Sequence, residues 1–186
     1  MTHRILIVDD EPRVLDGLKR VFRREPYEVL TANSAEEGLR VLASTDVDVV
    51  ISDHQMPGML GTDFLYIVAR EFPSTIRYML TGKPSLEVAI QAINDGAISR
   101  FYTKPCHELD LIISIRSALQ QKALISEAMR LLRRYKNQQA KLERIQRDYP
   151  EAASALNDTE GAQPLESMVN VTYEDLIDEL RRTFGD

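Results

Sequence analysis

The chain has 186 residues, and its 23 Lys and Arg side chains against 29 Asp and Glu give a formal net charge of −6. A composition that is 44% hydrophobic and 28% charged excludes a disordered chain. No apolar run approaches the roughly 20 residues that span a bilayer, and the first residues lack the pattern of a signal peptide. The single cysteine, Cys106, excludes an internal disulfide and a thiolate metal cluster. We therefore expect a cytoplasmic protein that makes no contact with a membrane.

The charges divide the chain into three parts. Residues 1–120 carry a net charge of −4, residues 121–149 a net charge of +5, and residues 150–186 a net charge of −7. This asymmetry predicts a globular body of mixed charge, a basic segment and an acidic tail.

The body alternates short runs rich in β-branched residues with segments of helical spacing. Ser34, with Glu37 three residues later, forms a capping box ahead of one helix. Pro84 and Ser85 open another, and Gly96 is placed to end it. The predicted strands are Arg4–Asp9, Tyr27–Ala32, Val47–Asp53, Ile76–Thr81 and Ile98–Thr103.

Strands such as Val47–Asp53 are apolar nearly throughout, as expected when helices cover both faces of a sheet. Five such strand–helix units predict an α/β fold, a doubly wound five-stranded parallel sheet. In this architecture ligands bind at the carboxyl ends of the strands. The residues that end the strands are therefore the first candidates for a functional site.

These strand ends carry Asp9, Asp10, Asp53, Thr81 and Lys104. Carboxylates crowded at one edge repel each other and call for a cation, and oxygen ligands without Cys or His favour Mg²⁺. The hydroxyl and the amine suit the oxygens of a phosphoryl group. One such Asp alone is more often a helix N-cap, but the set predicts a carboxylate nucleophile, a metal and groups that stabilise transferring charge.

Four motifs extend this set: ILIVDDE at 5–11, D-x-x-M-P-G-M-x-G at 53–61, M-L-T-G at 79–82 and F-Y-T-K-P at 101–105. With them, residues 4–119 resemble the receiver domain of two-component response regulators. The resemblance implies the flavodoxin-like strand order 2-1-3-4-5 and a receiver domain over residues 1–119. It also implies a protein that is not an enzyme beyond its own phosphotransfer and autodephosphorylation.

The same resemblance assigns roles around the acceptor. Asp53 would accept the phosphoryl group, and Mg²⁺ would be held by Asp9, Asp10, Asp53 and the backbone carbonyl of Gln55. Gln55 and Lys83 would set how long the phosphoryl group survives hydrolysis.

The resemblance further implies that Thr81 and Lys104 bind the phosphoryl oxygens and that the Lys104–Pro105 peptide bond is cis. Thr81 would move toward the new charge, and the switch aromatic Phe101 would fill the space it leaves. This change would repack the face formed by residues 84–119 and alter the assembly of the protein.

His54, next to Asp53, is given no direct role because successive strand residues point to opposite faces. Cys106 is expected to be a small, buried residue.

The basic segment is predicted to be helical because Glu108 to Tyr149 contains neither Pro nor Gly. Residues 120–149 would continue the last receiver helix and carry a heptad seam about 39 Å long at 1.5 Å per residue. The preferred interpretation is a parallel homodimeric coiled coil, with antiparallel pairing and packing on the receiver as alternatives. The seam consists of Leu124, Ala128, Leu131, Tyr135, Gln138, Leu142, Ile145 and Tyr149.

The tail divides into a flexible linker over residues 150–171 and a short acidic amphipathic helix over residues 172–184. Such a short helix needs a surface to dock on, in its own dimer or on another protein. The basic charges of 121–149 are explained by a solvated surface or by attraction to this tail, and nucleic acid is not favoured.

Three functions remain open. The first is a response regulator, phosphorylated by a sensor histidine kinase or a phosphotransfer protein, that controls a partner protein. The second is a transcription or antitermination regulator that binds nucleic acid. The third is the receiver portion of a longer output enzyme, such as a cyclic-dinucleotide phosphodiesterase, if the natural chain continues past residue 186.

Overall fold

The computed structural model describes residues 2–82 and 92–150. It separates into two compact units, Met1–Lys122 and Ala123–Asp186. None of the helices within the described ranges combines the length and the hydropathy needed to cross a membrane. The predicted linker and tail helix, over residues 150–171 and 172–184, lie outside the described residues except for residue 150.

The strands are β1 (His3–Val8), β2 (Tyr27–Ala32), β3 (Val49–Asp53), β4 (Ile76–Thr81) and β5 (Arg100–Thr103). The helices are α1 (Pro12–Phe22), α2 (Ala35–Ser44), α3 (Gly61–Glu71) and α5 (Glu108–Asp148).

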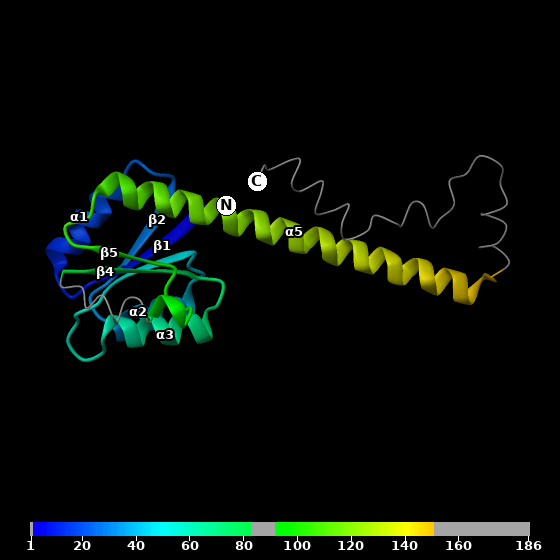
Figure 1. Cartoon of the computed structure of the whole chain (residues 1–186), viewed down its shortest axis with the longest axis horizontal. Coiled ribbons are helices and arrows are strands. Elements are labelled where there is room, and N and C mark those ends of the chain that lie inside the picture. Colours follow the sequence, from blue (N-terminus) through cyan, green and yellow to red (C-terminus); the bar gives the residue numbers. More distant parts are fainter. Residues whose placement is uncertain (1, 83–91, 151–186) are drawn as a thin grey trace. The chain divides into compact units, whose positions relative to one another are not determined.

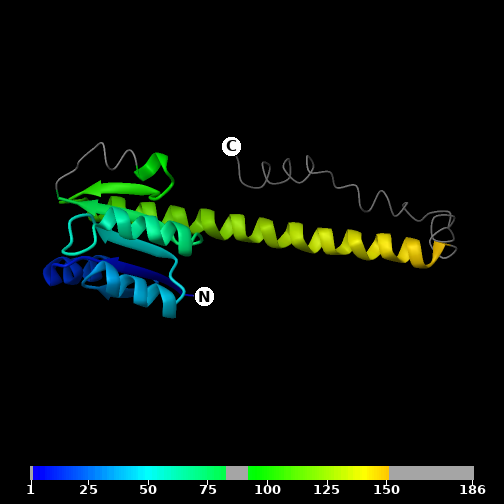
Figure 2. The same cartoon turned by 90° about the horizontal axis from the view of Figure 1, so that it is seen from below.

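The strands form one parallel sheet in the order β2-β1-β3-β4-β5, which confirms the predicted fold class and strand order. Helix α1 and the first turns of α5 cover one face, and α2 and α3 cover the other (Figure 1). Helices α2 and α3 lie side by side on their face (Figure 2). All five residues of β3 are buried, so the central strand reaches solvent on neither face.

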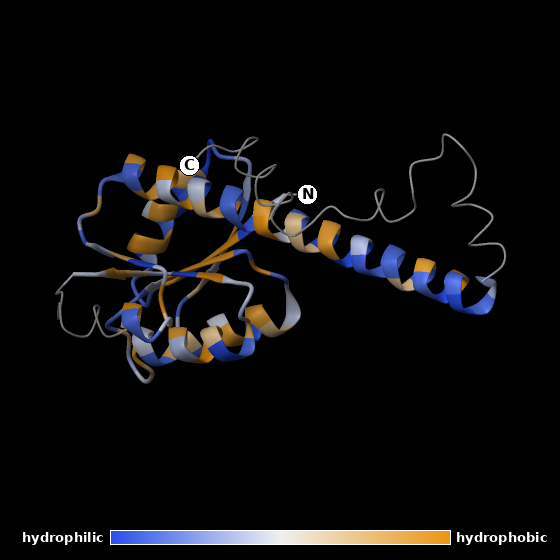
Figure 3. Cartoon of the chain, turned by 45° about the vertical axis from the view of Figure 1, so that its right-hand side comes forward, coloured by the Kyte–Doolittle hydropathy of each residue, from blue (hydrophilic) through white to orange (hydrophobic). Residues whose placement is uncertain are grey.

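Two hydrophobic clusters, one on each side of the sheet, form the core. Leu6, Val8 and Val50 point toward α2 and α3, and Ile5, Ile7 and Ile51 point toward α1 and α5. Figure 3 shows this hydrophobic colouring along the strands and on the helix surfaces that face them. Burial on both sides explains why these strands are apolar at consecutive positions rather than at alternate ones.

A buried hydroxyl pair joins β4 to α5. The Tyr78 hydroxyl lies 3.0 Å from the Ser114 carbonyl oxygen and 2.8 Å from the Ser114 hydroxyl. Tyr78 is 1% exposed, and burial raises the pKa of its hydroxyl although the hydrogen bond to Ser114 opposes that rise. Because hydrogen-bonding groups in a core must find partners, this contact specifies how the two elements meet.

Helix α5 confirms the prediction of one uninterrupted helix. It runs from Glu108 to Asp148, and the Tyr149 amide continues the helical pattern with a 2.9 Å bond to the Ile145 carbonyl. Its four buried residues, at 111, 114, 115 and 119, all lie in the first third of the helix. These residues belong to the first unit and pack against the sheet.

Asp48, just before β3, fastens β1 and α5 at the amino edge of the sheet. Its carboxylate accepts bonds from Lys122 Nζ at 2.7 Å and from His3 Nδ1 and the Arg4 amide, both at 3.1 Å. Burial raises the pKa of Asp48, but the bonds from Lys122, Arg4 and His3 outweigh burial and hold it below its ordinary value.

Three predicted strands have different bounds in the structure. β1 is shifted by one residue to His3–Val8, β3 begins at Val49 rather than at residue 47, and β5 begins at Arg100 rather than at residue 98. The Ile98 amide donates to the Ala92 carbonyl instead of joining the sheet. The Val47 carbonyl accepts the Thr75 hydroxyl instead of a main-chain amide.

The predicted caps agree in part. Ser34 Oγ accepts the Glu37 amide at 3.2 Å, as a capping box requires, but the Glu37 carboxylate accepts the Asn33 amide at 2.7 Å instead of that of Ser34. Gly96 has a φ of 71° and its amide donates to the Ile93 carbonyl, as expected where a helix ends. Pro84 and Ser85 lie outside the described residues.

Gly61 opens α3 where the chain folds back on β3. Its amide donates to the His54 carbonyl at 2.9 Å, and a Cβ added at Gly61 would lie 1.8 Å from the Asp53 carbonyl oxygen. No side chain fits there without moving the backbone that carries Asp53.

Gly61→Ala is therefore expected to lower the free energy of unfolding by about 3 kcal/mol, the upper part of the overpacking range. Gly17→Ala, in the middle of α1 with no atom within 4 Å of the new Cβ, is the matched control and should raise it by about 0.5–1 kcal/mol. Urea denaturation of both variants checks the pair. Equal effects at the two positions would contradict the close approach at Gly61.

Candidate functional site

The Lys104 ammonium group joins two buried carboxylates at the carboxyl edge of the sheet. Its Nζ lies 2.6 Å from Asp9 Oδ2 and 2.6 Å from Asp53 Oδ1. Asp9 follows β1 and is 1% exposed, Asp53 ends β3 and is 7% exposed, and Lys104 follows β5. Three residues separated by up to 95 positions in the chain thus meet at one point, because parallel strands end at the same edge.

Charge balance explains the state of this lysine. Burial lowers the pKa of Lys104, but the hydrogen bonds from its ammonium to Asp53 and Asp9 outweigh burial and raise the pKa above its ordinary value. The amine is therefore a fixed positive charge at neutral pH. Two carboxylates against one ammonium leave the buried group with one negative charge.

Backbone amides of the adjacent loops also hold the carboxylates of Asp9 and Asp53 in place. The Gln55 amide donates to Asp53 Oδ2 at 2.6 Å, and the Glu11 amide donates to Asp9 Oδ1 at 3.0 Å. Each oxygen of Asp53 is therefore engaged by a different partner. Gln55 itself is exposed, so its side chain borders solvent beside Asp53.

Thr81 ends β4, the strand next to Asp53, and Phe101 lies in β5, one strand further from it. Thr81 is 3% exposed, and its carbonyl accepts the Lys104 amide at 2.8 Å. Phe101 pairs with Met79 in the sheet register and packs against the cluster that lies beneath α2 and α3. The Lys104–Pro105 peptide bond is cis, in agreement with the expectation from the resemblance.

Asp10 is placed differently from its two partners. It is exposed, whereas Asp9 and Asp53 are buried against Lys104. Within residues 2–82 and 92–150 no three His, Cys, Asp or Glu side chains come close enough together to form a metal cluster. Lys83 lies outside the described residues.

Two neighbours of Asp53 carry features that the sequence did not reveal. The Ser52 hydroxyl, fully buried, donates to the Asp53 carbonyl at 2.8 Å. His54 Nδ1 is buried and, in the described part of the chain, has no hydrogen-bond partner. No motif singles out either residue, because both contacts depend on how the strand end is folded.

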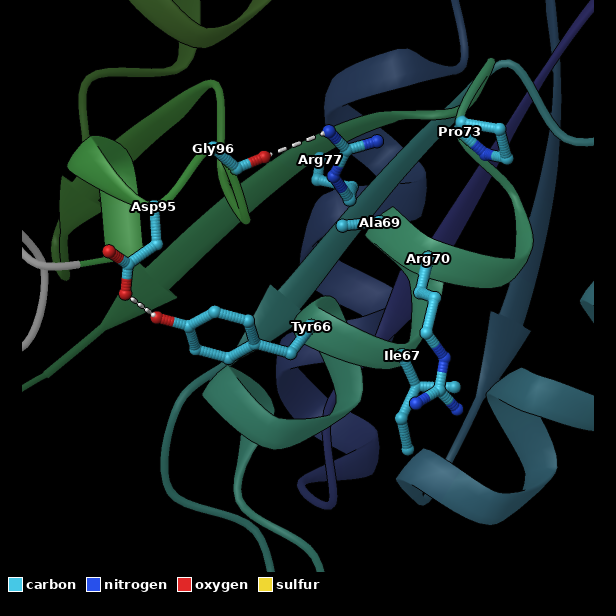
Figure 4. Close-up of a pocket in the computed structure, with 8 residues that line it drawn as sticks. All are labelled: Tyr66, Ile67, Ala69, Arg70, Pro73, Arg77, Asp95 and Gly96. Atoms are coloured by element: carbon cyan, nitrogen blue, oxygen red, sulfur yellow. Dashed lines mark hydrogen bonds between the residues drawn. The ribbon is translucent and has the colours of Figure 1, made fainter.

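Elsewhere in the described chain, a surface cavity of about 520 Å³ lies between α3 and the turn at residues 95–96 (Figure 4). Its polar groups are already engaged: the Tyr66 hydroxyl donates to Asp95 at 2.5 Å, and the Arg77 guanidinium donates to the carbonyls of residues 75, 96 and 97. Burial lowers the pKa of Arg77. None of the predicted site residues lines the cavity, which is formed by Tyr66, Ile67, Ala69, Arg70, Pro73, Arg77, Asp95 and Gly96.

All but one of the predicted seam residues lie within α5, and Tyr149 follows its end. Leu124, Leu131, Ile145 and Tyr149 are between 41% and 65% exposed. Ala128, Tyr135 and Leu142 are half-buried, and Gln138 is exposed. The second unit therefore presents apolar side chains that its described residues do not cover.

A parallel 2-1-3-4-5 sheet with an aspartate pair and a lysine at its carboxyl edge defines the receiver class of signalling domains. The family model of the response regulator receiver domain matches residues 5–116. The chain therefore belongs to the response regulator receiver family.

Two curated relatives illustrate the family. The chain is 34% identical over 127 residues to the hydrogenase transcriptional regulatory protein HoxA of Cupriavidus necator, an alignment covering 68% of this chain and 26% of HoxA. It is 38% identical over 126 residues to the transcriptional regulatory protein GlrR of Escherichia coli, covering 66% of this chain and 28% of GlrR. The chain thus matches only about a quarter of the length of these relatives.

A solved structure shows the same fold. The signal receiver domain of an HD domain-containing protein from Pseudomonas fluorescens is 36% identical, with a TM-score of 0.64 over 66% of this chain and 98% of that one.

Replacing Lys104 by Met tests the bridge. The free energy of unfolding of the variant should be about 1–3 kcal/mol lower than that of the wild type at neutral pH, because two buried carboxylates lose their shared charged partner. The pKa of Lys104 is raised in the folded state. Its contribution to the free energy of unfolding is therefore complete below the ordinary lysine pKa and is lost as pH rises through the pKa of Lys104 in the folded protein. The difference between wild type and variant should therefore stay constant up to about pH 10 and shrink above it.

Urea denaturation at several pH values measures this difference. Lys19→Met, at an exposed position in α1, should change stability by less than about 0.5 kcal/mol. A Lys104→Met variant as stable as the wild type at pH 7 would show that the bridge is not needed.

Proposed function

We propose that this protein is a response regulator that accepts a phosphoryl group on Asp53 from a sensor histidine kinase or a phosphotransfer protein. The observation that carries the proposal is the Lys104 ammonium held 2.6 Å from both Asp53 and Asp9. A fixed positive charge beside the carboxylate is what a phosphoacceptor needs, since it attracts the donor and then offsets the charge of the product.

The transfer follows from this arrangement. A carboxylate oxygen of Asp53 attacks phosphorus, and the bond from phosphorus to the donor breaks with its electron pair leaving on the donor. Lys104 then pairs with a phosphoryl oxygen, and the Thr81 hydroxyl donates to another. The Gln55 amide holds Asp53 Oδ2 and so fixes the direction of attack.

Magnesium fits the charge and the chemistry of this edge. Asp9, Asp10 and Asp53 carry three negative charges against the single charge of Lys104, and all the candidate ligands are hard oxygens. Asp9, Asp10, Asp53 and the Gln55 carbonyl would hold the ion, with Asp10 turning in from its exposed position. When bound, Mg²⁺ supplies positive charge that offsets the phosphoryl oxygens.

The response would begin at Thr81 and Phe101. Thr81 would move toward the phosphoryl oxygens, and Phe101, half-buried beside Met79, would fill the vacated space. This would repack the 84–119 face. Gln55, exposed beside the acceptor, and Lys83 would tune the lifetime of the phosphoryl group.

The output would pass through the helix to a partner protein in the cytoplasm. We propose a receiver over residues 1–119, a homodimeric coiled coil over residues 120–149, a linker over residues 150–171 and a docking helix over residues 172–184. The exposed apolar residues of α5 support the coil, because a helix gains stability by burying such a stripe.

A second function, transcriptional control, is favoured by the names of HoxA and GlrR, both called transcriptional regulatory proteins. Since this chain matches about a quarter of their length, a DNA-binding or enzymatic output would have to reside in residues outside the match.

Phosphorylation is tested with acetyl phosphate and Mg²⁺, followed by intact-protein mass spectrometry. The wild type should gain one phosphoryl group and lose it again on standing, while Asp53→Asn should gain none because an amide does not attack phosphorus. Asp46→Asn, at an exposed acid before β3, is the control and should behave like the wild type. Uptake by Asp53→Asn, or none by the wild type, would reject the proposal.

The coil is tested by sedimentation of the full chain. Leu142→Glu places a charge in the seam and should raise the dimer dissociation constant by at least about 100-fold, since both subunits lose a buried leucine. Ala140→Glu, two positions away and outside the seam, should leave the dimer intact. A monomeric wild type, or the same effect from both variants, would exclude this seam.

A further inference from the structure

Five basic residues form a stripe along α5 that the proposed function does not use. At about 100° per residue they fall within an arc of about 100° and extend over about 21 Å of the helix. The centre of this arc lies about 120° around the helix from the seam. Every member is exposed. We call this set the basic stripe; it consists of Arg130, Arg133, Arg134, Lys141 and Arg144.

The described part of the chain neutralises the basic stripe only at its two ends. Arg130 pairs with Glu127 at 3.5 Å, and Arg144 pairs with Asp148 at 3.4 Å. Within residues 2–82 and 92–150, no carboxylate forms an ion pair with Arg133, Arg134 or Lys141. Like charges three or four positions apart on one helix repel each other, as Arg130 does with Arg133 and Arg134, so an anionic partner would stabilise the stripe.

The chain carries such a partner immediately after the helix. Residues 151–186 contain nine acidic and two basic side chains, a net charge of −7. The first part, residues 151–171, holds four acidic side chains and no basic one. This segment begins three positions after α5 ends at Asp148, and 36 residues can extend well over 100 Å, far more than the length of the stripe.

Because the acidic segment is covalently joined to the helix, it is favoured over other anions as the partner of the basic stripe. A segment joined to the same helix by a few residues meets the stripe at an effective concentration in the millimolar range. A free polyanion of equal intrinsic affinity would have to exceed that concentration while also overcoming repulsion by the acidic segment. Individual surface ion pairs are weak and are screened by salt, so several must act together and the association must depend on ionic strength.

We propose that the acidic segment 151–186 associates with the basic stripe on α5 of its own chain. The contact occupies the side of the helix away from the seam, which stays available for dimerisation. It also shields the stripe from other polyanions. This inference does not depend on phosphorylation of Asp53.

Carbodiimide cross-linking of the full chain tests the contact, because the reagent joins a lysine amine to a nearby carboxylate with loss of water. Peptides linking Lys141 to residues 151–186 should be severalfold more abundant than those linking Lys19, an exposed lysine of α1, to the same residues. Their yield should fall as salt is raised. Equal yields at Lys141 and Lys19, or yields independent of salt, would overturn the proposal.

Charge-neutral variants provide a matched comparison. The triple variant Arg133→Gln, Arg134→Gln, Arg144→Gln keeps Lys141 as the reporter and should lower its cross-link to the segment at least about threefold. A control triple variant, Arg23→Gln, Arg24→Gln, Arg40→Gln, removes three exposed charges from the turn after α1 and from α2 and should leave the cross-link unchanged. Circular dichroism verifies that the helix persists in both. An unchanged yield in the stripe variant, or equal losses in the two variants, would overturn the assignment.

Two further outcomes would reassign the stripe. The first uses a mixture of ¹⁴N- and ¹⁵N-labelled chains that have exchanged subunits. If most cross-links join chains of different label, the acidic segment binds the basic stripe of a second copy, and the same-chain contact is overturned. Binding of a short DNA duplex by the full chain at physiological salt, weakened by the stripe variant but not by the control, would assign the stripe to nucleic acid. The proposal expects links of a single label and no such binding.

Discussion

The ammonium group of Lys104, shared by Asp9 and Asp53, is the interaction on which the site depends. Strands in a sheet lie about 4.8 Å apart, so a side chain from the end of β5 has to cross β4 to reach β3 and β1. The four-carbon stem of lysine covers part of that distance, and the bond from its amide to Thr81 fixes where the stem starts. Without this cation, two nearly inaccessible carboxylates would face each other unpaired, which is costly at low dielectric.

Much of this architecture follows from local patterns combined with one topological rule. The bounds of β2 and β4 agree with the apolar runs at 27–32 and 76–81, because helical spacing and turns delimit those runs. Asp9, Asp53 and Lys104 could be placed together because parallel strands end at one edge. The strand order came from the resemblance to receiver domains, and the structure shows the same order.

Other features depend on contacts between segments far apart in the chain and have no local signal. The start of β5 is set by the Ala92 carbonyl, which takes the Ile98 amide. The exposure of Asp10, beside the buried Asp9, reflects how the chain turns after β1 rather than any difference in residue type. The narrow space at Gly61 is a property of the folded loop; the glycine in the motif gives no measure of how close the backbone lies.

The hydroxyl pair between Tyr78 and Ser114 restricts the way in which α5 can respond to any event at the carboxyl edge. Translation of the helix along its axis by even one residue would break the hydrogen bonds between these two hydroxyls in a region that water does not reach. Each buried hydrogen-bonding group left without a partner there costs about 1–3 kcal/mol. Pivoting or twisting about that point preserves both bonds. The pair thus fixes one point of α5 against β4, and the proposed response would be confined to angular displacement of this helix.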